Sequence, residues 1–294
     1  MNPASMPVPA ARKPKIALVI GSGALKCVAA FGAVKVLQRE GIVIDMVVGC
    51  SGGSFCAVWV AQGAGDANAA AERFTRGWDG SLDAVRYRRL PGAMFPSVFG
   101  VDRGFALLDD RRINAAVTGY VGEGRFEDTA IPLFLVATDL GSGEKVVLSE
   151  GRRSDAIRAS IAIPLLLAPW PVGGRMLIDG GASEPLPIDV AMREGADIII
   201  AMGFEEQLDT DVGTLLQQVM HLKSLTVNNL IRAQYAFYSL AHHAEVILLS
   251  PEFDRRIGLR ALHHVPYLMS QGELAAEQQI PYLRRLLNLE RTGQ

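Results

Sequence analysis

KIALVIGSGALK, at residues 15–26, and VIDMVVGCSGGS, at residues 43–54, share one pattern. Each begins with an apolar run and stops at a glycine-rich turn, which is typical of a buried parallel strand that leads into a helix. Helical sequence follows both turns, over residues 26–40 and 54–78. Two successive strand–turn–helix units predict an α/β protein with a parallel sheet.

The rest of the chain continues this alternation of short apolar runs and longer helical stretches. Further strands are predicted at residues 132–138, 145–148, 175–178, 197–202 and 245–250. Further helices are predicted at residues 107–121, 154–163, 214–244 and 272–287. We therefore expect a three-layer α/β/α sandwich with a central, mostly parallel sheet. It would form a single domain over residues 14–290, preceded by a flexible tail at residues 1–13.

Composition limits the classes of protein to consider. Of the 294 residues, 49% are hydrophobic and 20% are charged, which excludes a mainly disordered chain. Lys and Arg total 29 against 31 Asp and Glu, and the formal net charge of −2 argues against a nucleic-acid partner. Cys27, Cys50 and Cys56 show no paired spacing, so they favour neither a disulfide scaffold nor a zinc site. We expect no metal and no organic cofactor.

The sequence also predicts where the protein works. It shows neither a signal peptide nor a transmembrane helix, so we expect a cytoplasmic protein. Arg86, Arg88 and Arg89 precede the apolar stretch LPGAMFP at residues 90–96. An ordinary loop over the core is the favoured interpretation of this segment. The alternative is a lid or a patch in peripheral contact with an anionic membrane surface. No oligomeric state is favoured.

The second glycine-rich turn, GCSGG at residues 49–53, matches the G-x-S-x-G pattern of a nucleophile elbow. A serine on a sharp strand-to-helix turn presents its hydroxyl outward, and only small neighbours such as Gly49 and Gly53 fit beside it. The start of the following helix favours developing negative charge. A short pattern also arises by chance, so a structural turn is the alternative. The position between a strand and a helix favours Ser51 as a nucleophile.

The first glycine-rich turn contains Gly21, Ser22, Gly23, Ala24 and Lys26. Backbone N–H groups of such a turn can hold an oxyanion or a phosphate. A dinucleotide-binding turn would need glycine at position 26, where lysine stands, and an acidic residue at the end of the next strand, which the sequence lacks. We therefore favour an oxyanion-binding loop.

A third candidate, Asp179, follows a predicted strand and precedes Gly180 and Gly181. A carboxylate at the end of a strand fits a general base at the edge of a sheet. Considered alone, an aspartate in an ordinary turn is the better interpretation.

Together, the three segments resemble the patatin-like phospholipase family. That family has a glycine-rich loop with a basic residue, then a G-x-S-x-G elbow, then a distant Asp-Gly-Gly/Ala turn. ASIAIP at residues 159–164 and ATDL at residues 137–140 are similar to two further segments of the family. The resemblance covers residues 14–205 well and the rest loosely. It implies a patatin-like fold and a serine acyl hydrolase of lipid carboxylic esters, such as a phospholipid or lysophospholipid.

The resemblance also implies a dyad of Ser51 and Asp179 with no catalytic histidine. Ser51 would attack the ester carbonyl and Asp179 would take its proton, while the amides around Gly23 and Ala24 would hold the oxyanion. Water would then hydrolyse the acyl-enzyme.

Two positions depart from the family's pattern. Lys26 is followed by Cys27 where the family has a basic residue and then glycine, so a side chain stands where the backbone needs room or a positive φ. Glu184 replaces an asparagine that the family has before Pro-x-Pro. If Glu184 lies near Asp179, repulsion between the carboxylates would raise the apparent pKa of the pair.

Two alternatives remain. One is a Ser–Asp–His hydrolase, because every histidine follows Asp179, as in the chain order of the α/β-hydrolases. These histidines are His221, His242, His243, His263 and His264. Against it, the serine follows only the second strand. The other alternative is a catalytically weak patatin fold that binds or regulates, which Cys27 and Glu184 favour.

Overall fold

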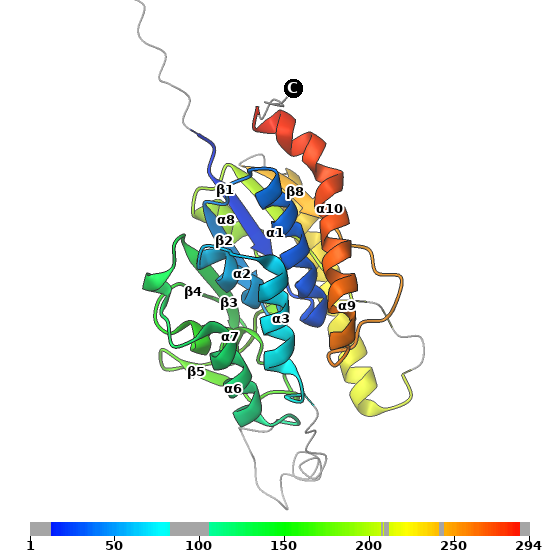
Figure 1. Ribbon diagram of the computed structural model, residues 1–294. Helices are drawn as coiled ribbons and strands as arrows, with labels where there is room; N and C mark the ends of the chain where they lie inside the picture. Colours follow the sequence, from blue (N-terminus) through cyan, green and yellow to red (C-terminus); the bar gives the residue numbers. More distant parts are fainter. Residues whose placement is uncertain (1–12, 83–105, 207, 209–211, 241–243, 289–294) are drawn as a thin grey trace, which may run out of the picture.

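The computed structural model describes residues 13–82, 106–206, 208, 212–240 and 244–288 (Figure 1). The predicted tail, apart from Lys13, and the arginine-rich segment at residues 86–96 lie outside the described residues.

Within these described ranges, eight strands form one sheet. The strands are β1 (Ile16–Ile20), β2 (Met46–Cys50), β3 (Leu133–Asp139), β4 (Lys145–Leu148), β5 (Trp170–Val172), β6 (Arg175–Asp179), β7 (Ile198–Met202) and β8 (Glu245–Leu249). Their order is β5-β6-β3-β2-β1-β7-β8, with β4 also paired to β3. The run from β3 to β8 is parallel, whereas β4, β5 and β6 pair antiparallel with their neighbours.

Helices and short 3₁₀ turns connect the strands. The helices are α1 (Ala29–Arg39), α2 (Gly53–Ala61), α3 (Ala67–Trp78), α6 (Asp110–Val121), α7 (Arg153–Ser160), α8 (Ile188–Arg193), α9 (Leu215–Leu240) and α10 (Val265–Leu286). The 3₁₀ turns are η1 (Ala24–Val28), η3 (Phe126–Asp128), η4 (Gly180–Ala182) and η5 (Leu262–His264).

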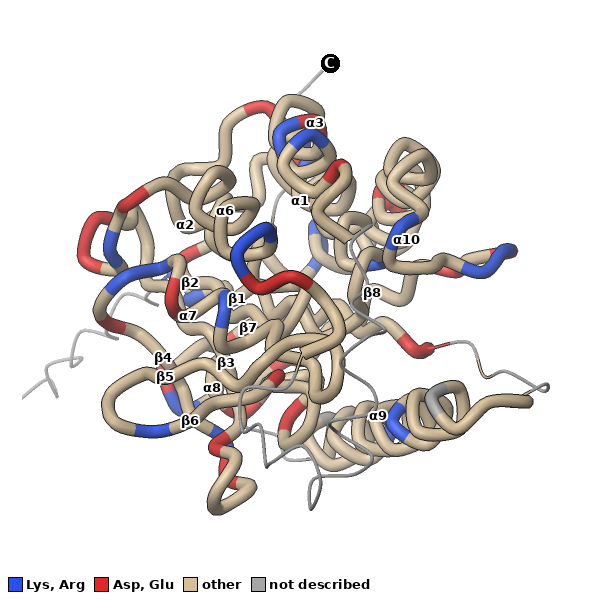
Figure 2. Tube along the Cα trace, turned by 90° about the horizontal axis from the view of Figure 1, so that it is seen from below, with Lys and Arg blue, Asp and Glu red and all other residues tan. Residues whose placement is uncertain are grey.

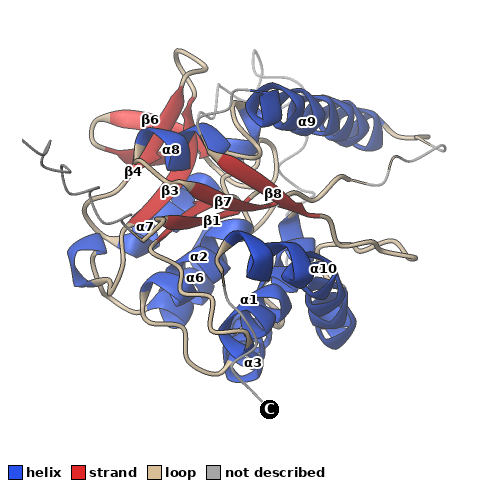
Figure 3. Ribbon diagram, turned by 90° about the horizontal axis from the view of Figure 1, so that it is seen from above, coloured by secondary structure: helices blue, strands red, loops and turns tan. Residues whose placement is uncertain are grey.

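The layers are those of a three-layer α/β/α sandwich. Figure 3 shows α8 and α9 on one face of the sheet and α1, α2, α3, α6 and α10 on the other. Every residue of β1, β2 and β7 is buried, because helices cover both faces of these central strands. The predicted α/β class and the mostly parallel central sheet are confirmed.

One predicted element is wrong. The single helix expected over residues 54–78 is two helices, since α2 ends at Ala61 and α3 begins at Ala67. The break contains Gly63, which has a φ of 101°. The Asp66 side chain then caps α3, accepting hydrogen bonds from the next turn's backbone N–H groups, including that of Asn68 at 2.7 Å.

Helices α1 and α10 cross at two glycines. A Cβ built on Gly272 would lie 1.8 Å from the carbonyl oxygen of Ala29, and one on Gly32 would lie 2.0 Å from that of Met269. Each glycine therefore allows the backbone of the other helix to approach closely. This contact joins the last long helix to the helix that follows the first glycine-rich turn.

We expect Gly272→Ala to lower the free energy of unfolding by about 2–3 kcal/mol, because the added methyl group meets backbone that cannot move aside cheaply. Gly119→Ala is the matched control. Gly119 also lies inside a helix, α6, but a Cβ there meets nothing within 4 Å. That substitution should stabilise the protein by about 0.5–1 kcal/mol. Urea unfolding of both variants measures the difference, and equal effects would contradict the crossing described here.

Candidate active site

Ser51 lies on a tight elbow between β2 and α2. Its φ of 52° is in the left-handed region, which a residue other than glycine adopts at a cost of about 1–3 kcal/mol. The start of α2 packs directly on the end of β1, since a Cβ on Gly53 would lie 2.4 Å from the carbonyl oxygen of Ile20. Gly49 is buried in β2 just before the elbow, where a Cβ would lie 2.7 Å from that of Ala57 on α2. Ser51 therefore occupies a sharp turn between a strand and a helix.

Strand β3 sets the relative position of Ser51 and Asp179. Cys50, at the end of β2, pairs with Val136. Asp179, at the end of β6, pairs with the next residue of β3, Ala137. Strand β6 overlaps only the last three residues of β3, so its carboxyl end stops at Ala137. The carboxyl ends of β2 and β6 therefore flank adjacent residues of β3. Two residues 128 apart in the chain thus come into contact.

The Ser51 hydroxyl donates a hydrogen bond to Asp179 Oδ2 at 2.6 Å. The second carboxylate oxygen, Oδ1, accepts from the N–H of Gly181 at 2.7 Å. Both oxygens are therefore used, one by the serine and one by the turn that holds the carboxylate. Ser51 is 5% exposed and Asp179 is 4% exposed.

Burial raises the pKa of Asp179 above its ordinary value, and the negative charge of Glu206 adds to this. The positive charge of Lys223 and the hydrogen bonds from Ser51 and Gly181 act in the opposite direction and offset only part of the effect. A carboxylate with a raised pKa is a stronger base than an exposed aspartate, so Asp179 is suited to accept a proton from the serine.

Ser160 fixes the backbone of the elbow. Its Oγ accepts a hydrogen bond from the Ser51 N–H at 2.8 Å and donates one to the carbonyl oxygen of Val136 at 2.6 Å. The Ser51 N–H is therefore occupied. Ser160 belongs to the ASIAIP segment, but the sequence alone indicated no role for it. Its position in that motif was the available signal.

The predicted oxyanion loop divides into two parts. The N–H groups of Gly21 and Ser22 donate to the carbonyl oxygens of Met202 and Pro185, at 2.9 Å and 2.7 Å. Within the part of the chain that the structure describes, no hydrogen bond engages the N–H groups of Gly23 and Ala24. Both amides are therefore available to a ligand.

Lys26 turns away from the elbow. Its Nζ donates to the carbonyl oxygen of Glu205 at 2.8 Å and lies 5.9 Å from the centre of the Phe253 ring. Burial lowers the pKa of Lys26. The side chain thus ties the loop to the segment after β7 and places positive charge behind the loop.

Cys27 fits the loop without strain. The structure gives a positive φ to Ala24, at 51°, and not to Cys27. The Cys27 thiol is buried and donates a hydrogen bond to the carbonyl oxygen of Gly21 at 3.3 Å. Cys27, Cys50 and Cys56 are all free and buried, and burial raises the pKa of each thiol.

Glu184 belongs to a separate ionic cluster. Lys145 Nζ lies 2.8 Å from Glu184 and 2.5 Å from Asp189. The carboxylate that raises the pKa of Asp179 is Glu206. Glu184 was the carboxylate expected from the sequence to act on Asp179; the structure gives this effect to Glu206, which the sequence did not indicate.

The three described histidines take no part in this contact. Among the described residues, no histidine forms a hydrogen bond with Ser51 or Asp179, and His221, His263 and His264 lie on α9 and η5. His242 and His243 lie outside the described residues.

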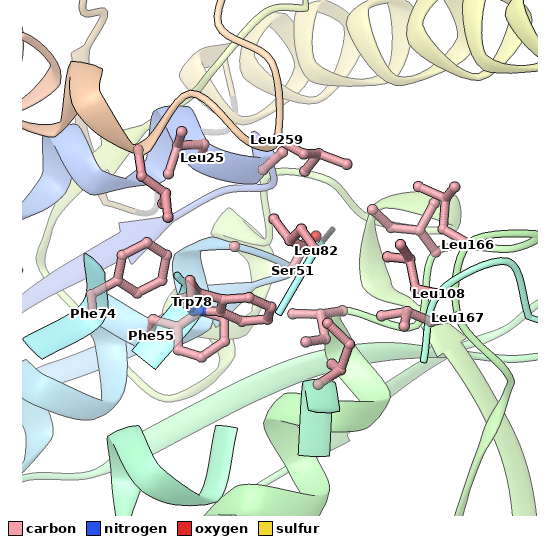
Figure 4. Close-up of a pocket in the computed structure, with 16 residues that line it drawn as sticks. Leu25, Ser51, Phe55, Phe74, Trp78, Leu82, Leu108, Leu166, Leu167 and Leu259 are labelled. Carbon is pink, nitrogen blue, oxygen red and sulfur yellow. The ribbon is translucent and has the colours of Figure 1, made fainter. Parts of the chain in front are cut away.

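An apolar cavity of about 80 Å³ opens beside Ser51. Figure 4 shows Phe55, Phe74 and Trp78 on one side of it and Leu108 and Leu167 on the other. The Phe55 ring packs edge-on against both other aromatic rings, with centroids 5.3 Å and 5.4 Å away. The lining suits a hydrocarbon chain rather than a polar ligand.

Within the described ranges, no helix has both the length and the apolar character needed to cross a bilayer. The same residues contain no group of three or more His, Cys, Asp or Glu side chains placed to hold a metal ion.

Fold and site together define an α/β protein whose serine elbow faces a buried carboxylate. Comparison of the sequence with known families gives a more specific assignment. The profile of the patatin-like phospholipases matches residues 18–192, more than half of the chain, so the chain belongs to the patatin-like phospholipase family. The resemblance stated from the sequence is thereby confirmed, and the α/β-hydrolases are not the family of this chain.

The relatives are longer proteins. An NTE family protein of Mycobacterium tuberculosis, named as uncharacterized, is 32% identical over 241 residues, or 81% of this chain and 62% of the relative. Patatin-like phospholipase domain-containing protein 6 of Mus musculus is 29% identical over 201 residues, or 68% of this chain and 14% of the relative. The chain therefore spans less than two thirds of either relative.

Among solved structures, VipD from Legionella pneumophila is similar at a TM-score of 0.47 and 13% identity, over 92% of this chain and 67% of that chain.

Proposed function

We propose that this protein is a serine acyl hydrolase that cleaves carboxylic esters of lipids, such as phospholipids or lysophospholipids. The direct 2.6 Å hydrogen bond from Ser51 Oγ to Asp179 Oδ2 carries this proposal. Membership of the patatin-like phospholipase family and the apolar cavity at the serine support a lipid substrate.

In the proposed reaction, Ser51 Oγ attacks the ester carbonyl while Asp179 Oδ2 accepts the hydroxyl proton. The N–H groups of Gly23 and Ala24 stabilise the negative charge on the carbonyl oxygen. The ester bond then breaks, and Asp179 returns its proton to the leaving alcohol. In the second half, Asp179 takes a proton from water as the water attacks the acyl-enzyme carbonyl. The bond to Ser51 Oγ then breaks, and Asp179 returns the proton to Ser51 Oγ, which releases the fatty acid and the free serine.

A panel of lipid esters tests the activity. Phosphatidylcholine, lysophosphatidylcholine, monoacylglycerol and a p-nitrophenyl ester of matched acyl length would be incubated with the full chain. We expect fatty acid to be released from at least one lipid at a rate that increases with enzyme concentration. Folded protein that releases none from any of them would favour the binding or regulatory alternative.

We expect single histidine substitutions to leave most of the turnover, because Asp179 already contacts the serine directly. The set comprises the alanine variants of His221, His242, His243, His263 and His264. Their kcat/KM values on the best ester would be compared with that of wild type. A histidine variant that loses as much rate as Ser51→Ala would contradict the dyad and support a Ser–Asp–His triad.

A further inference from the structure

A second cavity of about 310 Å³ adjoins the apolar one. Both are lined by Ala24, Ile163, Leu166 and Leu259, so these four residues form their common wall. Gly23 also lines the second cavity. The two amides available for an oxyanion thus lie at the boundary between an apolar space and the second cavity.

The second cavity is cationic. Its charged lining residues within the described chain are Lys26, Lys223, Arg256 and Glu206, three cations and one carboxylate. Lys26 is only 6% exposed and is held by the Glu205 carbonyl, so it contributes charge to the wall rather than a contact. Lys223, on α9, and Arg256, in the segment after β8, are more exposed than Lys26.

Lys223 is paired but only partly buried. Its Nζ lies 2.7 Å from Glu206 Oε1, and its side chain keeps 33% of its exposure. Lys223 and Arg232 are the only Lys, Arg, Asp or Glu residues of α9, whose trace in Figure 2 carries little charge. Arg232 is bound to Glu205 instead. Lys223 is therefore the charged side chain of α9 that lines the second cavity, and it is a candidate for binding substrate.

We propose that the second cavity is the subsite for the anionic, phosphate-bearing head group of a lipid, with Lys223 and Arg256 as its binding residues. This rests on the proposed function and names the substrate class for it. The acyl chain occupies the apolar cavity, and the ester carbonyl lies at Gly23 and Ala24. The phosphate takes the place of the Glu206 carboxylate as the partner of the Lys223 ammonium group. Charge-assisted hydrogen bonds to phosphate are stronger than neutral ones, so the subsite selects phospholipids over neutral glycerides.

The charge of Lys223 also reaches the proposed base. Burial acts to lower the pKa of Lys223, but the carboxylates of Glu206 and Asp179 raise it above the ordinary value. The subsite and the dyad are therefore electrostatically coupled. For this reason, the test measures a ratio between two ligands rather than turnover by one variant.

Two uncleavable ethers provide that ratio. The probes are 1-O-octylglycerol 3-phosphate and 1-O-octylglycerol, which share the alkyl chain and differ in the phosphate. We expect the full-length wild type to bind the phosphate-bearing ether about 10-fold or more tightly, as measured by calorimetry. Lys223→Met and Arg256→Met should each reduce this preference by about 5–10-fold, and Glu206→Gln should increase it.

Lys35→Met is the matched control, because Lys35 forms an equivalent 2.7 Å pair with Glu273 away from both cavities. It should leave the preference unchanged. Lys223→Met leaves the partly buried Glu206 carboxylate without its ion-pair partner, which could impair folding. The double variant Lys223→Met/Glu206→Gln removes that unpaired charge and serves as a second test. It should also lose the preference, with wild-type thermal unfolding.

Three results would overturn the subsite. They are equal binding of the two ethers, an unchanged ratio in folded Lys223 and Arg256 variants, and binding of glycerol 3-phosphate as tight as that of its octyl ether. The last would make the cavity a site for a free phosphate ester. Ether binding does not require cleavage, so a protein that selects the phosphate but hydrolyses no ester would refute only the proposed function.

Discussion

Ser51→Ala is expected to lower ester turnover by about 10⁴-fold or more and to abolish labelling by a fluorophosphonate probe. The hydroxyl is the nucleophile in the proposed reaction, and among the described residues no other serine hydroxyl is hydrogen-bonded to the Asp179 carboxylate. The substitution removes one oxygen from a site where Ser160 still holds the backbone N–H. The fold should therefore survive, and thermal unfolding should be close to that of wild type.

Peptide mass analysis of the labelled wild type would locate the adduct. We expect it on Ser51, and Ser142→Ala, a change at an exposed serine in the turn between β3 and β4, should label normally. An adduct on another serine, or labelling that persists in Ser51→Ala, would refute the assignment of the nucleophile. A folded wild-type protein that takes no label would favour the binding alternative.

Asp179→Asn is expected to reduce kcat by about 10²–10⁴-fold, because an amide cannot accept the serine proton. The wild-type kcat/KM should fall with acidity at a pH above the ordinary pKa of an aspartate, since the pKa of Asp179 is raised. Asp66→Asn, at an exposed helix cap where asparagine serves equally well, is the control. A wild-type rate that stays constant down to the ordinary pKa of an aspartate would contradict Asp179 as the base.

Asp179→Asn should also have a free energy of unfolding at least as large as that of wild type at neutral pH. A group whose pKa is raised in the folded state stabilises that state only while it is protonated. The contribution of Asp179 is therefore present below its unfolded pKa and is lost as the pH rises through the raised folded value. Urea unfolding between pH 4 and pH 8 should show that the stability of Asp179→Asn increases relative to that of wild type as the pH increases. If the stability of wild type increases relative to the variant instead, the ionised carboxylate stabilises the fold.

The sequence predicted the parts of the fold that depend on local pattern. Buried parallel strands are continuous apolar runs, so β1, β2, β3, β7 and β8 were all expected within a few residues. The short strand β5 was missed because it pairs only with β6 at the edge and contains Pro171. The break between α2 and α3 was missed although Gly63 and Asp66 were available as signals.

The site was less completely predictable. Ser51, Asp179 and the first glycine-rich turn belong to motifs, and motifs are short and local. Lys223 and Glu206 belong to none, and they reach the site only because α9 packs beside the segment that follows β7. Their influence on the pKa of Asp179 depends on burial and distance, which no pattern of residues along the chain contains.

The three buried thiols give the protein an internal reporter of its own motions. Cys27 lies in η1 after the first glycine-rich turn, Cys50 ends the strand before the elbow, and Cys56 lies on α2. Each is at most 2% exposed and, with its pKa raised, is protonated at neutral pH, so a thiol reagent reacts only when the surrounding structure opens. The rate of that reaction therefore measures how often the structure around Ser51 opens. A ligand that stabilises the closed site slows the reaction.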